Sequence, residues 1–199
     1  MSHTDSSPNP EVAESTQRLP GDFAIWVFIL AELTTFAAFF SAYAIARARN
    51  VALFNESQRS VDLTAGAINT VLLITGSWFV VMAIRAIHRD QQKWCATWLT
   101  AGLLSGCAFI TVKLNEYGDK AEQGVDMSTN TFYMFYFSLT FFHMMHVLLG
   151  MAFLGIVLTK TLRGRYSSRN CSTVESSGAY WHMVDLLWIV LFPMVYVMR

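Results

Sequence analysis

Long apolar segments constrain the fold of this 199-residue chain more than any other feature. Each is close to the ~20 residues that an α-helix needs to cross about 30 Å of hydrocarbon. A helix suits that environment because it satisfies its backbone hydrogen bonds internally. The sequence therefore predicts an all-α protein, an integral membrane bundle of five transmembrane helices. The predicted helices are Phe23–Ala46, Leu63–Ile84, Trp94–Val112, Thr131–Thr159 and Ala179–Val197.

The chain divides into a polar tail and one membrane domain, residues 21–199. Residues 1–20 are rich in Ser, Pro and acidic side chains and contain no apolar core. We therefore expect a mobile tail without a cleavable signal peptide, followed by an uncleaved first helix. The net charge is zero, so the charge balance suggests no nucleic-acid partner.

Local signals predict where several helices begin. The segment from Leu19 to Asp22 offers a stop and a cap before the first helix. Asp62 is expected to cap the second, and Thr129 or Asn130 the fourth. Pro193 is expected to kink the last helix, because proline removes a backbone donor.

The three cysteines are expected to be free thiols. Cys95 and Cys107 lie on one predicted helix, about 18 Å apart at ~1.5 Å per residue, which is too far for a disulfide. Cys171 lies in a basic loop. No CxxC motif occurs, so zinc-ribbon and c-type haem sites find no support.

Charges in the loops predict the orientation. The tail and the second and fourth loops carry eight Lys and Arg residues, and the opposite side carries six. Because cytoplasmic loops are enriched in these residues, we expect a cytoplasmic N-terminus and a periplasmic C-terminus. The third loop, with Glu116, Asp119, Glu122 and Asp126, is acidic and fits the outside. The six opposite-side cations are Arg47, Arg49, Arg59, Lys113, Lys120 and Arg199.

Ionisable side chains interrupt three apolar segments. They are Glu32 in the first, His143 and His146 in the fourth, and His182 and Asp185 in the fifth. Such a group costs at least roughly 2.5–3.5 kcal/mol inside a membrane helix, so it normally faces protein and has a partner. Counted from the inner end, all five fall in the inner half of the membrane. A shared buried network is therefore one interpretation.

Three roles remain open for these groups. Hydrogen bonding between helices is favoured, because intramembrane polar residues commonly hold helices together. Glu32 could instead exchange protons in a transport or proton-conducting module. A membrane metalloenzyme could use His143, His146, His182 and Asp185 as ligands. The small number of histidines argues against this third interpretation, and no metal is expected on this chain.

Five motifs, in order, resemble subunit III of the haem-copper oxidases. The resemblance covers nearly all of the chain after the tail and matches the last five helices of that family. Two helices of the longest family members have no counterpart here, and Met144 stands where the family usually has glycine. The motifs are Pro20–Phe40, Ile68–Trp78, KLNEY at Lys113–Tyr117, SLTFFHMMHVLLG at Ser138–Gly150, and Glu175 followed by Tyr180–Phe192.

The resemblance implies a non-catalytic subunit that packs on a haem-copper catalytic subunit in the bacterial inner membrane, binds lipid and supports assembly, stability and proton uptake. It implies no cofactor on this chain, with haem and copper or non-haem iron in the partner. Glu32 matches the family's intramembrane carboxylate. The remaining matched polar positions are Glu116, His143, His146, Glu175, His182 and Asp185.

The short length and the sequence of the last helix look most like the NorE-type branch of the family. That branch is associated with nitric oxide reductase in denitrifying bacteria. Five-helix quinol-oxidase subunits are the near alternative.

Overall fold

The computed structural model describes residues 23–168 and 170–198. The predicted mobile tail, residues 1–20, and the predicted cap before the first helix lie outside this part of the chain. Within it, all of the long elements are helices, which confirms the all-α prediction. Five helices are long and apolar enough to cross a membrane, as predicted.

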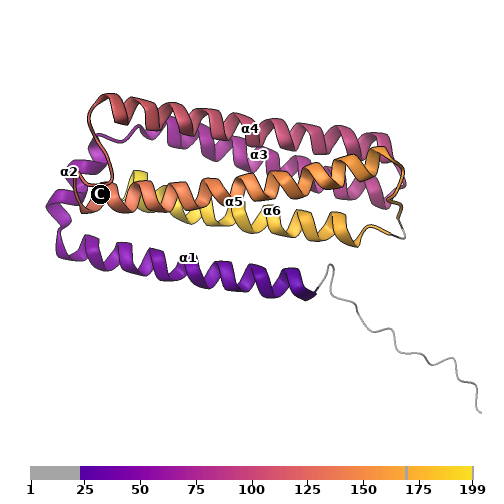
Figure 1. The fold of residues 1–199 in the computed structure, drawn as a ribbon, viewed down its shortest axis with the longest axis horizontal. Helices are drawn as coiled ribbons and strands as arrows, with labels where there is room; N and C mark the ends of the chain where they lie inside the picture. Colours follow the sequence, from indigo (N-terminus) through magenta and orange to yellow (C-terminus); the bar gives the residue numbers. More distant parts are fainter. Residues whose placement is uncertain (1–22, 169, 199) are drawn as a thin grey trace, which may run out of the picture.

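The five long helices lie side by side as one elongated bundle (Figure 1). α3 packs most extensively against α4, and α6 contacts α1, α3 and α5. The start of α1 and the π-helical turn that ends the described chain lie at opposite ends of the bundle (Figure 1). The elements are α1 (Phe23–Arg49), α2 (Val51–Arg59), α3 (Leu63–His88), α4 (Gln92–Glu122), α5 (Thr131–Leu162), α6 (Ser172–Phe192) and a π-helical turn η1 (Pro193–Val197).

Several helices extend beyond their predicted ends. α4 continues to Glu122 rather than stopping at Val112, and α6 begins at Ser172 rather than at Ala179. Hydropathy locates only the segment inside hydrocarbon, whereas backbone hydrogen bonding continues the helix through polar residues on either side. The short helix α2 was not predicted, and its one buried large apolar side chain is Phe54.

Three predicted local signals are present. The Asp62 side chain accepts a hydrogen bond from the Thr64 N–H at 2.8 Å, and Asn130 accepts one from the Tyr133 N–H at 2.9 Å. At Pro193 the chain changes from α-helical to π-helical geometry. Proline lacks the donor that the α-helical ladder requires, which accounts for the break at this residue.

Large aromatic side chains fill the centre of the bundle. Trp181 on α6 is 1% exposed and lies against positions where other helices carry glycine. A Cβ atom at Gly106 or Gly150 would come within 3.1 Å of the Trp181 ring. Small residues at these positions therefore let α4 and α5 approach α6 closely.

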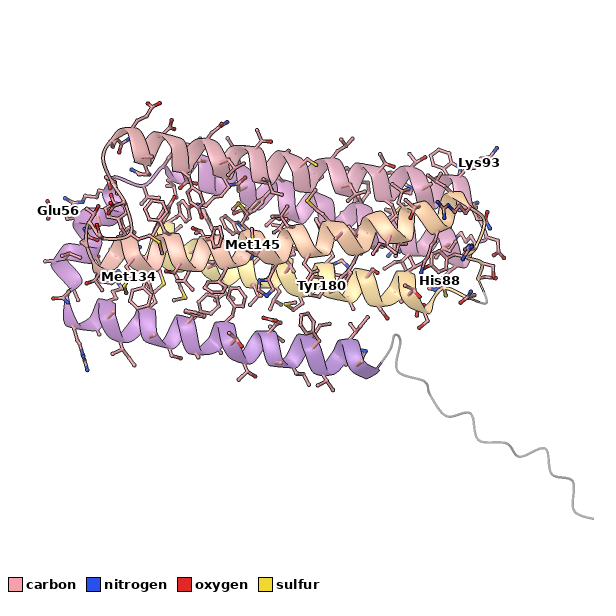
Figure 2. All side chains as sticks on the ribbon, in the orientation of Figure 1. Glu56, His88, Lys93, Met134, Met145 and Tyr180 are labelled. Atoms are coloured by element: carbon pink, nitrogen blue, oxygen red, sulfur yellow. The ribbon has the colours of Figure 1, made fainter. Side chains whose placement is uncertain are left out.

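α1 joins the bundle mainly through aromatic rings, which occupy the space between it and α5 and α6 (Figure 2). It is the least covered of the five long helices, since 11% of its apolar window is buried against 28–56% for the others. The ring pairs along α1 are Phe28 with Tyr180, Phe39 with Phe142, and Tyr43 with Phe135.

Candidate functional site

Glu32 on α1 and His146 on α5 form a polar pair between otherwise apolar helix faces. The Glu32 Oε2 atom lies 2.9 Å from the His146 Nε2 atom. His146 Nδ1 lies 2.7 Å from the carbonyl oxygen of Phe142, which can only accept, so Nδ1 carries a proton. The other ring nitrogen, Nε2, faces the Glu32 carboxyl group, so the contact links α1 to α5. The Phe36 ring packs edge-on against the imidazole at 5.2 Å.

His182 and Asp185 on α6 face α3. The His182 Nδ1 atom lies 2.6 Å from the Ser77 hydroxyl, and Asp185 lies next to the same pair. The Asp185 Oδ1 atom is buried and has no hydrogen-bond partner among the described residues. This group ties α6 to α3 through one serine that the sequence analysis did not assign to a site.

His143 occupies a different place from His146, although the two are three residues apart. Its side chain is fully buried in the core, 5.1 Å from the Trp188 ring and 5.7 Å from the Phe109 ring, centroid to centroid. Neither ring nitrogen has a hydrogen-bond partner in the part of the chain that the structure describes. His143 therefore packs as an aromatic core residue between α4 and α6.

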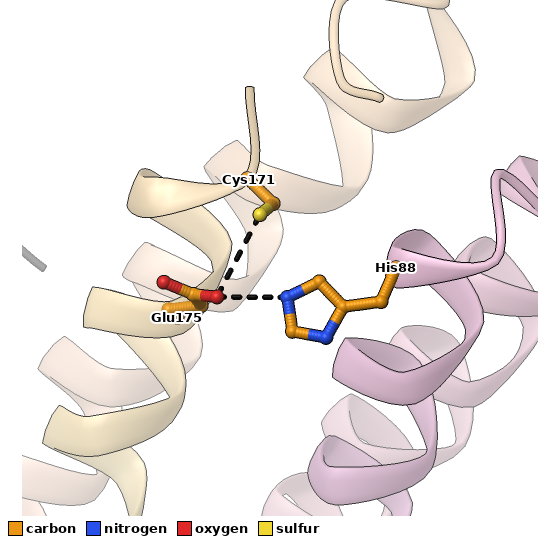
Figure 3. A group of neighbouring side chains, drawn as sticks. All are labelled: His88, Cys171 and Glu175. Atoms are coloured by element: carbon orange, nitrogen blue, oxygen red, sulfur yellow. Dashed lines mark hydrogen bonds and ion pairs between the residues drawn. The ribbon is translucent and has the colours of Figure 1, made fainter. Parts of the chain in front are cut away.

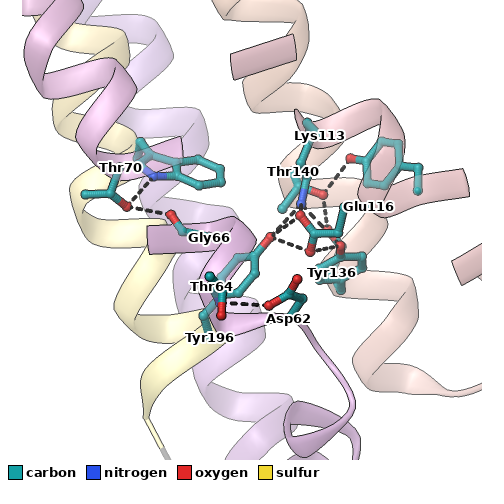
Figure 4. Close-up of polar contacts among 11 residues, drawn as sticks. Asp62, Thr64, Gly66, Thr70, Lys113, Glu116, Tyr136, Thr140 and Tyr196 are labelled. Carbon is teal, nitrogen blue, oxygen red and sulfur yellow. Dashed lines mark hydrogen bonds and ion pairs between the residues drawn. The ribbon is translucent and has the colours of Figure 1, made fainter. Parts of the chain in front are cut away.

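Glu116 belongs to the most extensively hydrogen-bonded group in the interior (Figure 4). Lys113 donates from Nζ to Glu116 Oε2 at 3.0 Å and to the Tyr196 hydroxyl at 2.5 Å. The hydroxyls of Tyr136 and Tyr196 donate to Glu116 Oε1 at 2.5 Å and 2.9 Å. The group joins α4, α5 and η1. We name it the Lys113–Glu116 cluster.

This cluster corrects two sequence assignments. Lys113 was counted as a loop cation and Glu116 as an acidic loop residue, but both lie on α4 and are buried, at 0% and 4% exposure. Asp119 and Glu122 also lie on α4, so Asp126 is the one member of that acidic set in the α4–α5 loop. The spacing of Lys113 and Glu116 would have paired them on one helix face if the longer helix had been recognised.

Glu175 lies in the first turn of α6, at the end of the bundle opposite to η1 (Figure 1). Figure 3 shows it beside His88 and Cys171. Its Oε1 atom is 2.8 Å from His88 Nε2 and 3.6 Å from Cys171 Sγ. Partial burial, together with the adjacent charge of Glu175, raises the pKa of the Cys171 thiol above its ordinary value. From the sequence, Cys171 was expected to lie in a loop, and neither it nor His88 was assigned to a site.

The polar residues from the sequence analysis therefore do not form one shared network. Glu32 with His146, His182 with Ser77, the Lys113–Glu116 cluster and Glu175 with His88 are separate contacts. In the prediction, depth along the membrane brought together only the five ionisable groups of the apolar segments. Depth does not fix which neighbouring helix a side chain faces. Among the described residues, one group of three His, Cys, Asp or Glu donors converges, and it contains none of the three intramembrane histidines.

Two shallow apolar grooves flank the contact of Phe39 with Phe142. One, of about 520 Å³, runs along α1 and is lined by Thr34, Thr35, Ala38, Phe39 and Ala42. The other, of about 400 Å³, lies over α5 and the α4–α5 loop, and its lining includes Met127 and Phe142.

Comparison with known proteins decides the family. The sequence model described as "Cytochrome c oxidase subunit III" matches residues 20–199. The chain belongs to this family. It is 31% identical to cytochrome c oxidase subunit 3 of Synechocystis over 177 residues, covering 88% of this chain and 75% of the relative. It is 27% identical to quinol oxidase subunit 3 of Bacillus subtilis over 197 residues, covering 98% and 95%.

A third family relative has a different chain organisation. The heme-copper oxidase subunit I+III of Aeropyrum pernix is 31% identical over 179 residues, which cover 87% of this chain. This chain spans 22% of that longer protein.

Proposed function

We propose that this chain is the non-catalytic third subunit of a bacterial haem-copper respiratory complex. It packs on the catalytic subunit and supports the assembly, stability and proton uptake of the complex. The match of the family model to residues 20–199 carries the proposal. The name of the Aeropyrum relative, which combines subunits I and III, supports subunit I as the partner.

The geometry fits a supporting role. The buried polar groups bond to one another across helices, which stabilises the packing of a membrane bundle. The haem and copper, or non-haem iron, belong to the partner subunit in this proposal. The two apolar grooves beside Phe39 and Phe142 offer surfaces for the acyl chains of bound phospholipid. We place the complex in the inner membrane, with the N-terminus cytoplasmic and the C-terminus periplasmic.

The reaction of the complex is either oxygen reduction or nitric oxide reduction. The relatives above carry the names of cytochrome c and quinol oxidase subunits. The sequence of the last helix favours the NorE-type branch and nitric oxide reductase.

Affinity purification through a tag on the N-terminal tail tests the proposal. From membranes dissolved in mild detergent, we expect a large haem-containing subunit to co-purify in constant ratio with this chain. Assays of oxygen and nitric oxide consumption on that complex then distinguish the two branches. Recovery of this chain alone, with no haem-containing partner, would refute the proposal.

A second candidate function rests on the Glu32–His146 pair, which places a carboxyl group and an imidazole in contact between two helices. A stand-alone proton conductor would use this pair without a partner subunit. If the chain is instead an accessory subunit, proteoliposomes containing only this chain should show no proton flux beyond that of empty liposomes. A flux that Glu32→Gln abolishes, and that the exposed control Glu122→Gln leaves unchanged, would favour the conductor instead.

A further inference from the structure

Three side chains of the kinds that bind metal ions meet where α3 ends and α6 begins (Figure 3). His88 is the last residue of α3, Cys171 immediately precedes α6, and Glu175 lies one turn into α6. One donor atom from each lies within 4.8 Å of the others. The donors come from two segments that are distant in sequence. His88 lies 87 residues before Glu175, whereas Cys171 and Glu175 are four residues apart.

The loop that carries Cys171 is fixed to the turn that follows His88. The carboxylate of Asp90 accepts hydrogen bonds from the Ser168 N–H at 2.7 Å and from the Ser168 hydroxyl at 2.8 Å. Gln92 donates to the carbonyl oxygen of Tyr166 at 2.8 Å, and the Tyr166 side chain is 4% exposed. The hydrogen bonds of this loop hold the donors near one another independently of their own contacts.

The distances suit a small tetrahedral ion. Bonds of about 2.3 Å to sulfur and about 2.1 Å to oxygen, at a tetrahedral angle, place these two atoms about 3.6 Å apart. The observed separation of Cys171 Sγ and Glu175 Oε1 is 3.6 Å. The corresponding nitrogen–oxygen separation is about 3.4 Å, whereas His88 and Glu175 are 2.8 Å apart. The His88 side chain is 45% exposed, so it has room to move outward by this difference.

We propose that His88, Cys171 and Glu175 form a zinc site that links the end of α3 to the start of α6. A thiolate, an imidazole and a carboxylate are the three kinds of ligand that Zn²⁺ takes from proteins. The Cys171 thiol releases its proton to solvent when the metal binds. Because His88 is exposed, a water molecule completes the tetrahedron. The site is separate from the intramembrane histidines and needs no redox chemistry.

Cobalt titration of the purified full-length chain tests the site, because Co²⁺ reports tetrahedral thiolate ligation by its absorption spectrum. After chelator treatment, we expect one Co²⁺ per chain with a thiolate-to-cobalt band that Zn²⁺ displaces. Cys171→Ser should abolish the band, and His88→Gln should weaken binding roughly 10-fold or more. Cys107→Ser is the matched control, since it removes an exposed cysteine elsewhere on the chain and should leave the titration unchanged.

A second readout distinguishes the site from adventitious binding. Zn²⁺ should slow alkylation of Cys171 in the Cys107→Ser background and raise the melting temperature, and both effects should disappear with His88→Gln. Circular dichroism establishes that each variant is folded. Absence of a stoichiometric thiolate band, or a band that survives in Cys171→Ser, would overturn the proposal.

Discussion

The Lys113–Glu116 cluster shows what a single ionisable residue contributes inside this bundle. Taking two charges out of water is unfavourable, and their attraction compensates only when further hydrogen bonds satisfy them. Here the hydroxyls of Tyr136 and Tyr196 supply those bonds, and the Lys113 ammonium also lies 4.6 Å from the centre of the Tyr136 ring. Each member of the cluster therefore depends on the others.

Removal of one charge from this cluster should be strongly destabilising. We expect Glu116→Gln to lower the free energy of unfolding by about 3–5 kcal/mol, because Lys113 is then left buried without its counter-ion. Unfolding in mixed micelles, followed by circular dichroism, measures the change. The exposed control Glu122→Gln should have little effect on the free energy of unfolding. The double variant Lys113→Met with Glu116→Gln should be less destabilised than Glu116→Gln alone. Equal losses in the single and double variants would contradict the interpretation.

Asp126 in the α4–α5 loop provides a pH prediction outside the membrane. Its Oδ1 atom accepts hydrogen bonds from the Ser128 N–H at 2.8 Å and the Ser128 hydroxyl at 2.7 Å, which lower the pKa of the carboxyl group below its ordinary value. A lowered pKa means that the carboxylate stabilises the loop at and above the ordinary pKa of Asp. This contribution is lost as the pH falls through the lowered value. NMR titration of aspartate-labelled protein should show this lowered pKa and a rise in Ser128→Ala. No rise in Ser128→Ala would contradict the assignment.

At the scale of elements, apolar length predicted the five long helices correctly but not their ends. Residues such as Lys113 and Glu116 were assigned to a loop because charge was taken to mark the membrane boundary. The Lys113–Glu116 cluster makes charge acceptable inside the helix, and a count of charges cannot detect such pairing. The short helix α2 was missed because its nine residues are too few for a hydropathy signal.

The close packing of α3 against the end of α6 and η1 gives a prediction at the scale of elements. A Cβ atom on Gly66 would lie 2.8 Å from the Tyr196 ring and 2.9 Å from the Phe192 ring. We expect Gly66→Ala to destabilise the fold by about 1–3 kcal/mol, because rigid rings must shift. Gly118→Ala is the matched control, since no atom lies within 4 Å of its added Cβ, and it should be neutral or stabilising. A neutral Gly66→Ala would show that η1 is loosely packed.

For the whole molecule, the motifs identified the family, whereas the partners of the site residues required the structure. Glu32 and His146 were both singled out from the sequence, yet nothing there distinguished His146, which meets α1, from His143, which faces the core. Helix rotation and neighbour choice depend on packing with distant segments. The convergence of His88, Cys171 and Glu175 was beyond sequence reasoning for the same reason, because a loop brings them together.

Haem and metal analysis of the separated subunits is the most direct test that this chain supports catalysis without carrying a redox centre. The complex is purified through this chain, the subunits are dissociated, and iron, copper, zinc and haem are measured on each. We predict that all haem, iron and copper remain with the large subunit and that this chain retains at most one zinc ion. Stoichiometric haem, iron or copper on the separated chain would contradict an accessory role.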